Sequence, residues 1–455
     1  MKYSTPRLVI AALLSAPLLA APAAAQAPST AMQIAQGDTG AAAVAPSRAS
    51  SAATPDSVRA DAPKAAAPAK TADARPLGNT LVHANKNGTF RLDVTGRVQG
   101  LYQLSSPDAR TNEITYGSSF ANKALPEETS LFRIRRGRVG FEGYAYDPKY
   151  EYNVQVELAG PSVSLKRAYL NYRMLDGDVN VRVGKFKVPF GRQQLTSIFS
   201  QQLAERSLVS DEFAKGDDDG AMLWGTPADG KLEYYVGVFN GEGNNKNSQQ
   251  DKTNQWAGRL AWSPLGRFAY TGPATGNTSR FAFSLGANAN LNGGWLYEVN
   301  GATGVQAPIE TCTTGTCIVD HGDDARIRNV GLDAAAKWHG VSWIAEAFAR
   351  RLDPIQDGLS SIDARGWYSQ LGAFVKPDRL ELGARYGQLD PNRAASNDLV
   401  TEVSPFVNVY LRGNDFKVQT DYTLLHTETM DRSLPTPAPT SFDDARLRVQ
   451  FLVSF

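Results

Sequence analysis

The segment 444–455 at the end of the chain alternates in a way that few folds accommodate. Every odd-numbered position from Ala445 to Phe455 is apolar, and every even-numbered position except Leu452 is polar or charged. Because successive side chains of a β-strand point to opposite faces, this segment has one apolar face and one charged face. Its length matches the roughly 9–11 residues that a tilted strand needs to cross a bilayer. A soluble sandwich seldom stops on an aromatic residue, so the pattern is typical of a bacterial outer-membrane barrel, and we expect the barrel assembly machinery to recognise Phe455.

The beginning of the chain predicts export. Lys2 and Arg7 precede the apolar stretch 8–21, and a run of small residues then offers a cleavage site, so residues 1–25 are expected to be a signal peptide. The alternative, a membrane-spanning helix, requires roughly 18 uninterrupted apolar residues, but Pro17 interrupts this shorter stretch and Pro22 follows it.

The next segment, 26–80, is rich in Ala, Pro, Ser and Thr and contains no aromatic residue. Such a composition buries too little apolar surface to offset the entropy of ordering. We expect a flexible periplasmic extension, with a weak helix at 41–45 or tethering to the cell wall as alternatives. The barrel then occupies residues 81–455.

Alternating segments separated by turn residues predict an all-β protein, a 16-stranded antiparallel transmembrane β-barrel, because the number of strands is even as single-chain bacterial barrels require. The segments are 90–104, 131–144, 149–159, 165–174, 178–186, 219–226, 231–239, 254–262, 279–289, 326–337, 341–350, 364–375, 378–388, 400–411, 415–426 and 444–455. Long and short connections mostly alternate. The exceptions are 159–165 and 263–278, which allow the strand count to differ by two.

The second predicted strand changes the face of its apolar residues part of the way along. Phe132 and Ile134 set one outward parity, whereas Val139 and Phe141 set the opposite one. An extra residue in a β-bulge turns the following side chains over, so we expect a bulge near Arg136-Gly137.

This bulge turns Arg133, Arg135 and Arg138 toward the lumen. Arginine facing lipid at mid-membrane depth costs about 2–4 kcal/mol, which excludes the opposite arrangement. Further basic residues are expected to line the pore. They are Arg97, Arg192, Arg206, Arg385, Arg446 and Arg448.

In the fifth predicted strand, we expect a similar change of face at Gly184. Its valines point outward before the glycine and Phe186 points outward after it, which turns Arg182, Lys185 and Lys187 inward.

Three motifs and the ending of the chain resemble the phosphate-selective porin O and P family. The arginine-rich run 132–141 is similar to the second-strand motif of that family, and Gly-Lys-Phe-Lys-Val-Pro-Phe-Gly at 184–191 is similar to its signature. The segment 380–386 and the ending at Phe455 also fit, so the similarity covers about 88–455. The resemblance implies a homotrimeric outer-membrane channel whose third loop folds inward and narrows the pore.

The residues of that loop, 187–218, agree with this expectation. Gly191 and Gly220 allow sharp turns near both ends, and the loop is longer than a surface connection needs to be. An apolar middle section would pack on the inner wall, while Arg192 and Arg206 would meet the aqueous lumen.

These features favour a passive channel for small anions, phosphate or polyphosphate being the expected solutes. The planar fork of arginine binds two oxygens of an oxyanion at once, and a series of moderate sites lets an anion move onward. The alternative for the arginines is structural, with Glu205, Asp211 or Glu212 of the loop as partners. The alternatives for the whole chain are a general, weakly selective porin and a structural or adhesin barrel with a plugged lumen.

Other activities are not expected. None of the 4 histidines lies beside a plausible serine nucleophile motif, so the chain is not predicted to be an enzyme. The strand period explains the basic residues better than nucleic-acid binding does. Export favours a disulfide between Cys312 and Cys317. A metal site with His321 and Asp320 is the alternative, but it lacks an obvious fourth ligand, so neither metal nor other cofactor is expected.

Overall fold

The computed structural model describes residues 81–107, 128–160, 162–214, 216–241, 254–276, 280–296, 324–354, 360–431 and 438–455. All of them belong to one compact unit, Ala66–Phe455. The predicted signal peptide and extension, together with Cys312 and Cys317, lie outside the described residues. Within the described part, no helix has the length and apolar character needed to cross a membrane.

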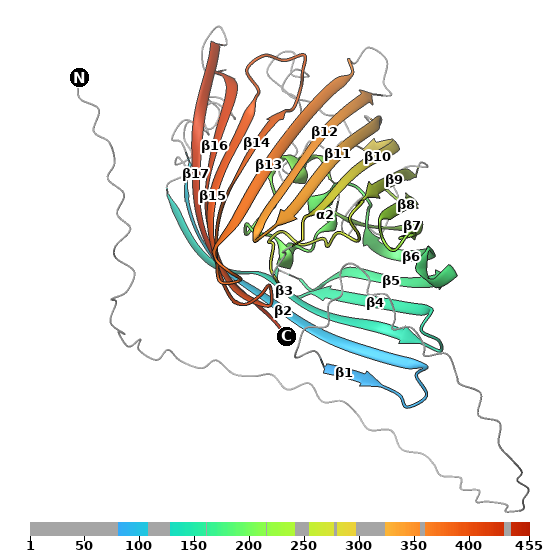
Figure 1. Cartoon of the computed structure of the whole chain (residues 1–455). Helices are drawn as coiled ribbons and strands as arrows, with labels where there is room; N and C mark the ends of the chain where they lie inside the picture. Colours follow the sequence, from blue (N-terminus) through green and yellow to red (C-terminus); the bar gives the residue numbers. More distant parts are fainter. Residues whose placement is uncertain are drawn as a thin grey trace, which may run out of the picture. The chain divides into compact units, whose positions relative to one another are not determined.

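Antiparallel strands close into a barrel (Figure 1), because each strand from β2 to β17 pairs with the next one in sequence and β17 then pairs with β2. The strands of the ring are β2 (Phe90–Ser106), β3 (Thr129–Ala145), β4 (Tyr150–Glu157), β5 (Ser164–Met174), β6 (Val179–Lys187), β7 (Asp217–Gly225), β8 (Leu232–Phe239), β9 (Gln255–Trp262), β10 (Ala282–Leu296), β11 (Asp324–Trp338), β12 (Val341–Pro354), β13 (Ile362–Lys376), β14 (Leu380–Asp390), β15 (Val400–Arg412), β16 (Phe416–Asp431) and β17 (Ala438–Ser454). The prediction of a 16-stranded barrel is confirmed, and every predicted segment overlaps one of these strands.

The two faces of the barrel differ as a membrane requires. In β11, Val330 and Leu332 point outward and are 54% and 65% exposed, whereas Asn329 and Asp333 on the inner face are buried. The same alternation continues around the ring, so the outer surface is an apolar band suited to lipid and the inner surface is polar.

The predicted bulge in β3 is present one residue earlier than expected. Gln99 of β2 lies opposite Arg136, but the next residue, Gly100, lies opposite Ile134, which leaves Arg135 as the extra residue. Arg133 and Arg138 therefore both lie on the inner side, as the sequence predicts.

The expected switch in β6 is wrong for Phe186. The register of β6 against β5 and β7 runs through Gly184 without a shift. Phe186 is 1% exposed and belongs to an apolar cluster inside the barrel that also contains Phe213 and Phe348. Apolar residues face inward here because the following loop covers this part of the inner wall and turns it into a small core.

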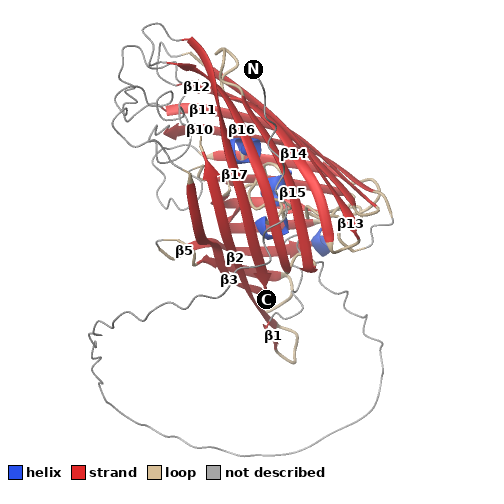
Figure 2. Cartoon of the chain, turned by 90° about the vertical axis from the view of Figure 1, so that its left-hand side faces the viewer, coloured by secondary structure: helices blue, strands red, loops and turns tan. Residues whose placement is uncertain are grey.

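That loop, residues 188–216, folds into the barrel, and this confirms the prediction of an inward third loop. It contains the helices α2 (Arg192–Leu195) and α3 (Leu208–Phe213) and the 3-10 helix η3 (Ile198–Ser200). Figure 1 shows α2 within the curve of the strands, and Figure 2 shows the helices inside the barrel wall.

The connection between β9 and β10 also enters the barrel. Phe268 and Tyr270 of this connection are 4% and 7% exposed, and Gly272 donates its backbone N–H to the carbonyl of Ser200 at 2.8 Å. Strands alternate in direction, so β6 and β9 end at opposite ends of the barrel. The two inward segments thus enter from opposite ends and meet inside. This inward course explains why the connection 263–278 is longer than the alternation of long and short connections predicts.

A short strand, β1 (Leu81–Ala84), pairs with β2 on the same edge as β17, directly after the last residue of β17 that pairs there. Phe455 and Gly96 exchange backbone hydrogen bonds of 2.7 and 2.8 Å, and β1 then pairs with β2 next to them.

Candidate functional site

The inward loop is held against the part of the barrel formed by β11–β16, here called the anchoring wall. Arg192 donates through Nε to Asp333 at 2.6 Å, and Asp333 also pairs with Arg259 of β9. The backbone N–H groups of Arg192 and Gln193 donate to the carboxylate of Glu346. Charged hydrogen bonds in a buried setting fix the start of the loop firmly, since leaving either partner unpaired there would cost several kcal/mol.

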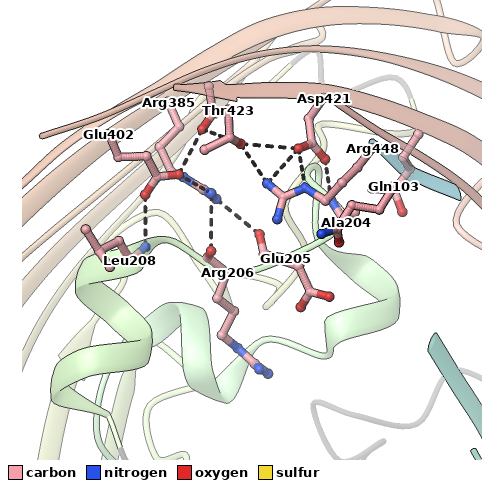
Figure 3. Close-up of polar contacts among 12 residues, drawn as sticks. Gln103, Ala204, Glu205, Arg206, Leu208, Arg385, Glu402, Asp421, Thr423 and Arg448 are labelled. Atoms are coloured by element: carbon pink, nitrogen blue, oxygen red, sulfur yellow. Dashed lines mark hydrogen bonds and ion pairs between the residues drawn. The ribbon is translucent and has the colours of Figure 1, made fainter. Parts of the chain in front are cut away.

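Two further buried ion pairs hold the middle of the loop (Figure 3). Arg385 pairs with Glu402 at 2.5 Å and donates to the backbone carbonyls of Glu205 and Arg206 at 3.2 Å each. Glu402 in turn accepts from the backbone N–H of Leu208 at 2.9 Å.

Arg448 repeats this arrangement beside the first pair. It pairs with Asp421 at 2.7 Å, and Asp421 accepts from the backbone N–H of Ala204 at 3.1 Å. Three of the predicted pore arginines, Arg192, Arg385 and Arg448, therefore have carboxylate partners in the anchoring wall.

Glu205 joins the loop to β3 as well. Its carboxylate accepts from Arg135 at 2.5 Å and from Arg136 at 2.6 Å. Burial alone would raise the pKa of Glu205, but the charges and hydrogen bonds of Arg136 and Arg135 lower it to about 2. The loop thus carries a permanent negative charge between two arginines.

Arg97 and Arg138 hold η3 through its aromatic ring. The guanidinium carbon of each lies 5.2 Å from the centre of the Phe199 ring. Arg138 also donates to Glu157 at 2.6 Å. Such cation–π contacts leave the in-plane N–H donors of the guanidinium available for other partners.

The basic residues of β5 and β6 lie across the lumen from the anchoring wall. Lys166 and Arg167 pair with Asp217 at 2.9 and 2.5 Å. Lys187 donates to the carbonyl of Leu195 at 2.5 Å.

Lys185 is buried, and its Nζ lies 3.8 Å from the carboxylate of Asp219 on β7. A polar recess of about 20 Å³ between the loop and this side of the barrel is lined by Arg97 and Arg167, among others, and by Ser197 of the loop.

Three predicted arginines of the strands have no carboxylate within ion-pair distance among the described residues. Arg133 donates to Gln103 at 3.4 Å and Arg182 to Asn171 at 3.3 Å, both neutral amides. Arg446 lies on the inner face of β17, two residues before Arg448, opposite Thr423.

Arg206 differs from these because it belongs to the loop. Its Nε donates to the carbonyl of Gln193 at 3.4 Å, and its side chain points away from the anchoring wall (Figure 3). Burial lowers the pKa of the Arg206 guanidinium, and the carboxylate of Asp211 opposes this shift.

The sequence prediction omitted Arg136, Lys166 and Arg167. Arg136 faces inward because the bulge lies at Arg135, one residue before the expected place. Lys166 is the extra residue of a second bulge, in β5. Adjacent basic residues within a strand are the signal for both, since one of each pair would otherwise face lipid.

An apolar outer band, a charged lumen and a loop folded into it define a bacterial outer-membrane channel of the porin class. The chain belongs to the family of phosphate-selective porin O and P, whose sequence model matches residues 111–455. The outer-membrane location and the porin class predicted from the sequence are confirmed.

Solved structures share the fold. The outer membrane channel DcaP of Acinetobacter baumannii is 14% identical, with a TM-score of 0.52, and the match covers 82% of this chain and 100% of that chain. The outer-membrane expressed OmpT of Vibrio cholerae is 12% identical, with a TM-score of 0.50, over 82% of this chain and 100% of that chain. At these identities the likeness concerns the fold alone.

A relative from Aquifex aeolicus, described as an uncharacterized protein, is 31% identical over 137 residues, or 28% of this chain. The match spans 29% of the length of that relative.

Proposed function

We propose that the barrel is a passive channel that prefers small anions, phosphate or polyphosphate among them. One observation carries the proposal: Arg133, Arg182 and Arg446 lie on the inner wall with no carboxylate partner among the described residues. A positive charge that no neighbour compensates attracts anions strongly where a narrow, low-dielectric pore limits screening.

The basic residues divide into two roles in this proposal. Arg192, Arg385 and Arg448, paired with buried carboxylates, hold the loop that narrows the lumen. Arg133, Arg182, Arg206 and Arg446 supply donors along the path of the anion, whereas Arg97 and Lys187, which have partners of their own, contribute positive charge. Arg135 and Arg138 share their donors with Glu205 and Glu157, so they contribute field more than contact.

A series of such donors suits conduction better than one tight site does. Each guanidinium offers a planar fork to two oxygens of an oxyanion, and the next one is available before the first is lost. Phosphate carries one or two negative charges near neutral pH, and its doubly charged form gains more from this field than chloride does.

A plugged structural barrel is the second candidate. The hydrogen bond between Gly272 and Ser200 favours this candidate, because it joins the two inward segments and these segments together fill part of the lumen. A general porin with weak selectivity is the third.

The current through the purified protein in planar bilayers separates these candidates. Under a potassium chloride gradient the reversal potential should favour chloride, and added phosphate should reduce the chloride current. Cation selectivity would overturn the proposal. Anion selectivity without phosphate block would leave a general anion porin, and absence of current would favour the plugged barrel.

The family also leads us to propose a homotrimer in the membrane. The mass of the detergent-extracted protein, measured by native mass spectrometry, should be three times that of the chain. A monomer as the sole species would contradict this assignment.

A further inference from the structure

An aromatic recess lies on the inner wall, away from the anchored side of the loop. It occupies about 70 Å³ and is partly open. Five aromatic side chains line it, together with Arg182 and residues of the loop. They are Tyr169 of β5, Phe186 of β6, Trp224 of β7, Tyr235 of β8 and Tyr270 of the β9–β10 connection.

Arg182 lies among these rings. Its guanidinium carbon is 4.2 Å from the centre of the Tyr169 ring, 5.0 Å from Trp224 and 5.7 Å from Phe186. Contacts of this kind stabilise the charge and hold the guanidinium plane in place, while its edge stays available for hydrogen bonds.

The edge of this guanidinium carries little else. Nε donates to Asn171 at 3.3 Å, and no carboxylate of the described residues lies within ion-pair distance. The carboxylate of Glu151 interacts electrostatically with Arg182, but its ion pair is with Arg173, at 3.6 Å. The terminal N–H groups of Arg182 therefore have no charged acceptor among these residues.

The aromatic wall is preorganised. Asn171 accepts a hydrogen bond from the indole N–H of Trp224 at 2.8 Å, in addition to the bond from Arg182. Trp224 in turn stacks on Tyr235, with ring centres 6.0 Å apart and planes 7° from parallel. Side chains fixed by their neighbours lose little entropy when a solute enters.

We propose that this recess binds organic anions that join a carboxylate to an aromatic ring. The carboxylate would take the two terminal N–H groups of Arg182, and the ring would lie among the surrounding aromatic side chains. Inorganic phosphate uses the first half of this site and gains nothing from the second. The inference rests on the proposed function, since it names a solute class for the same lumen.

The size of the recess agrees with a small solute. A buried water needs roughly 10–15 Å³ of such volume, so about 70 Å³ holds several waters or one small organic anion beside the open lumen. Leu195 and Pro189 of the loop form part of the lining, which places the solute between the loop and the wall.

Benzoate and acetate form a matched pair of probes, because they share the carboxylate and differ in the ring. In detergent-solubilised full-length protein, calorimetric titration should give a Kd for benzoate roughly tenfold below that for acetate. A difference of this size is expected from burying the benzoate ring and from its contacts with the aromatic side chains. In bilayers, benzoate should reduce the chloride current at correspondingly lower concentration.

Two variants divide the site into its halves. Arg182→Gln should weaken both probes roughly tenfold, since each loses the charged donor. Trp224→Leu should weaken benzoate roughly fivefold and leave acetate nearly unchanged, so that the preference for the ring falls. The controls are Arg365→Gln and Trp262→Leu, which alter an arginine with a 62% exposed side chain and a lipid-facing tryptophan. Both should keep the preference of the unaltered protein.

Equal Kd values for benzoate and acetate in the unaltered protein would overturn the inference, and so would an unchanged preference in Trp224→Leu. If Trp224→Leu does not fold, Trp224→Phe, which keeps a ring, should retain most of the preference, and its complete loss would count against the site. Cation selectivity in bilayers with calorimetric benzoate binding intact would reject the proposed function and keep this site. Anion selectivity without benzoate preference would do the reverse.

Discussion

Gly272 donates its backbone N–H to the carbonyl of Ser200 at 2.8 Å, and this bond joins two segments that enter the barrel from opposite ends. The contact is tight at Gly272, because an added Cβ would lie 3.0 Å from Cγ of Gln202 and 3.1 Å from the Ser200 carbonyl oxygen. The lumen therefore contains two inward segments, and this hydrogen bond is a junction between them.

Gly272→Val should separate these segments. Overpacking of a filled interior costs about 1–3 kcal/mol, so the urea midpoint of unfolding should fall and the noise of the open-channel current should rise. Gly100→Val is the control, since an added Cβ at Gly100 meets nothing within 4 Å. Equal behaviour of the two variants would show that the junction adds no stability.

Arg385→Met should destabilise the loop more than any exposed substitution does. The change leaves Glu402 buried and unpaired, which costs about 3–5 kcal/mol, and frees the carbonyls of Glu205 and Arg206. Chemical unfolding measures the loss. The double variant Arg385→Met/Glu402→Met should recover much of it, because the uncompensated charge is gone. No recovery would mean that the contacts to the loop carbonyls dominate.

Arg133→Gln should lower anion preference without lowering stability. Arg133 has no carboxylate partner among the described residues, and removing its charge should change the anion-to-cation permeability ratio by about 1 kcal/mol, or roughly fivefold. Reversal potentials provide the measurement, and Arg365→Gln serves as the control. A fall in stability with unchanged selectivity would assign Arg133 to the scaffold.

Acid should loosen the loop at Glu205. The pKa of this carboxyl is about 2 in the folded protein, below its ordinary 4.5, because of the arginines that flank it. A depressed pKa contributes stability that is present above about pH 4.5 and is lost as the pH falls through 2. Current fluctuations should therefore increase between pH 4 and pH 2, whereas Glu205→Gln should show them at every pH. A pH response retained in Glu205→Gln would point to another group.

The strands could be predicted from the sequence because lipid imposes a strict rule on one face. Val330 and Leu332 have to be apolar, and arginine has to turn away from lipid, so alternation and bulges both leave a readable pattern. The bulge in β3 lies within one residue of its predicted position.

The lumen could not be predicted with the same accuracy, because lipid imposes no rule there. Phe186 faces inward because a distant segment covers it, which no local pattern reveals. The partners Asp333, Glu402 and Asp421 likewise come from strands far from the loop in sequence. Which arginine is anchored and which is available depends on such pairings.

The short strand β1 has a consequence for how the barrel closes. Phe455 pairs with Gly96, and Leu81 already occupies the place opposite Val94. If β17 slid two residues along β2, its end would collide with β1, so β1 acts as a physical stop for the last strand. The circumference of a barrel depends on the stagger of its strands as well as their number. A segment of 4 residues beyond the ring thus helps to set the bore of the channel.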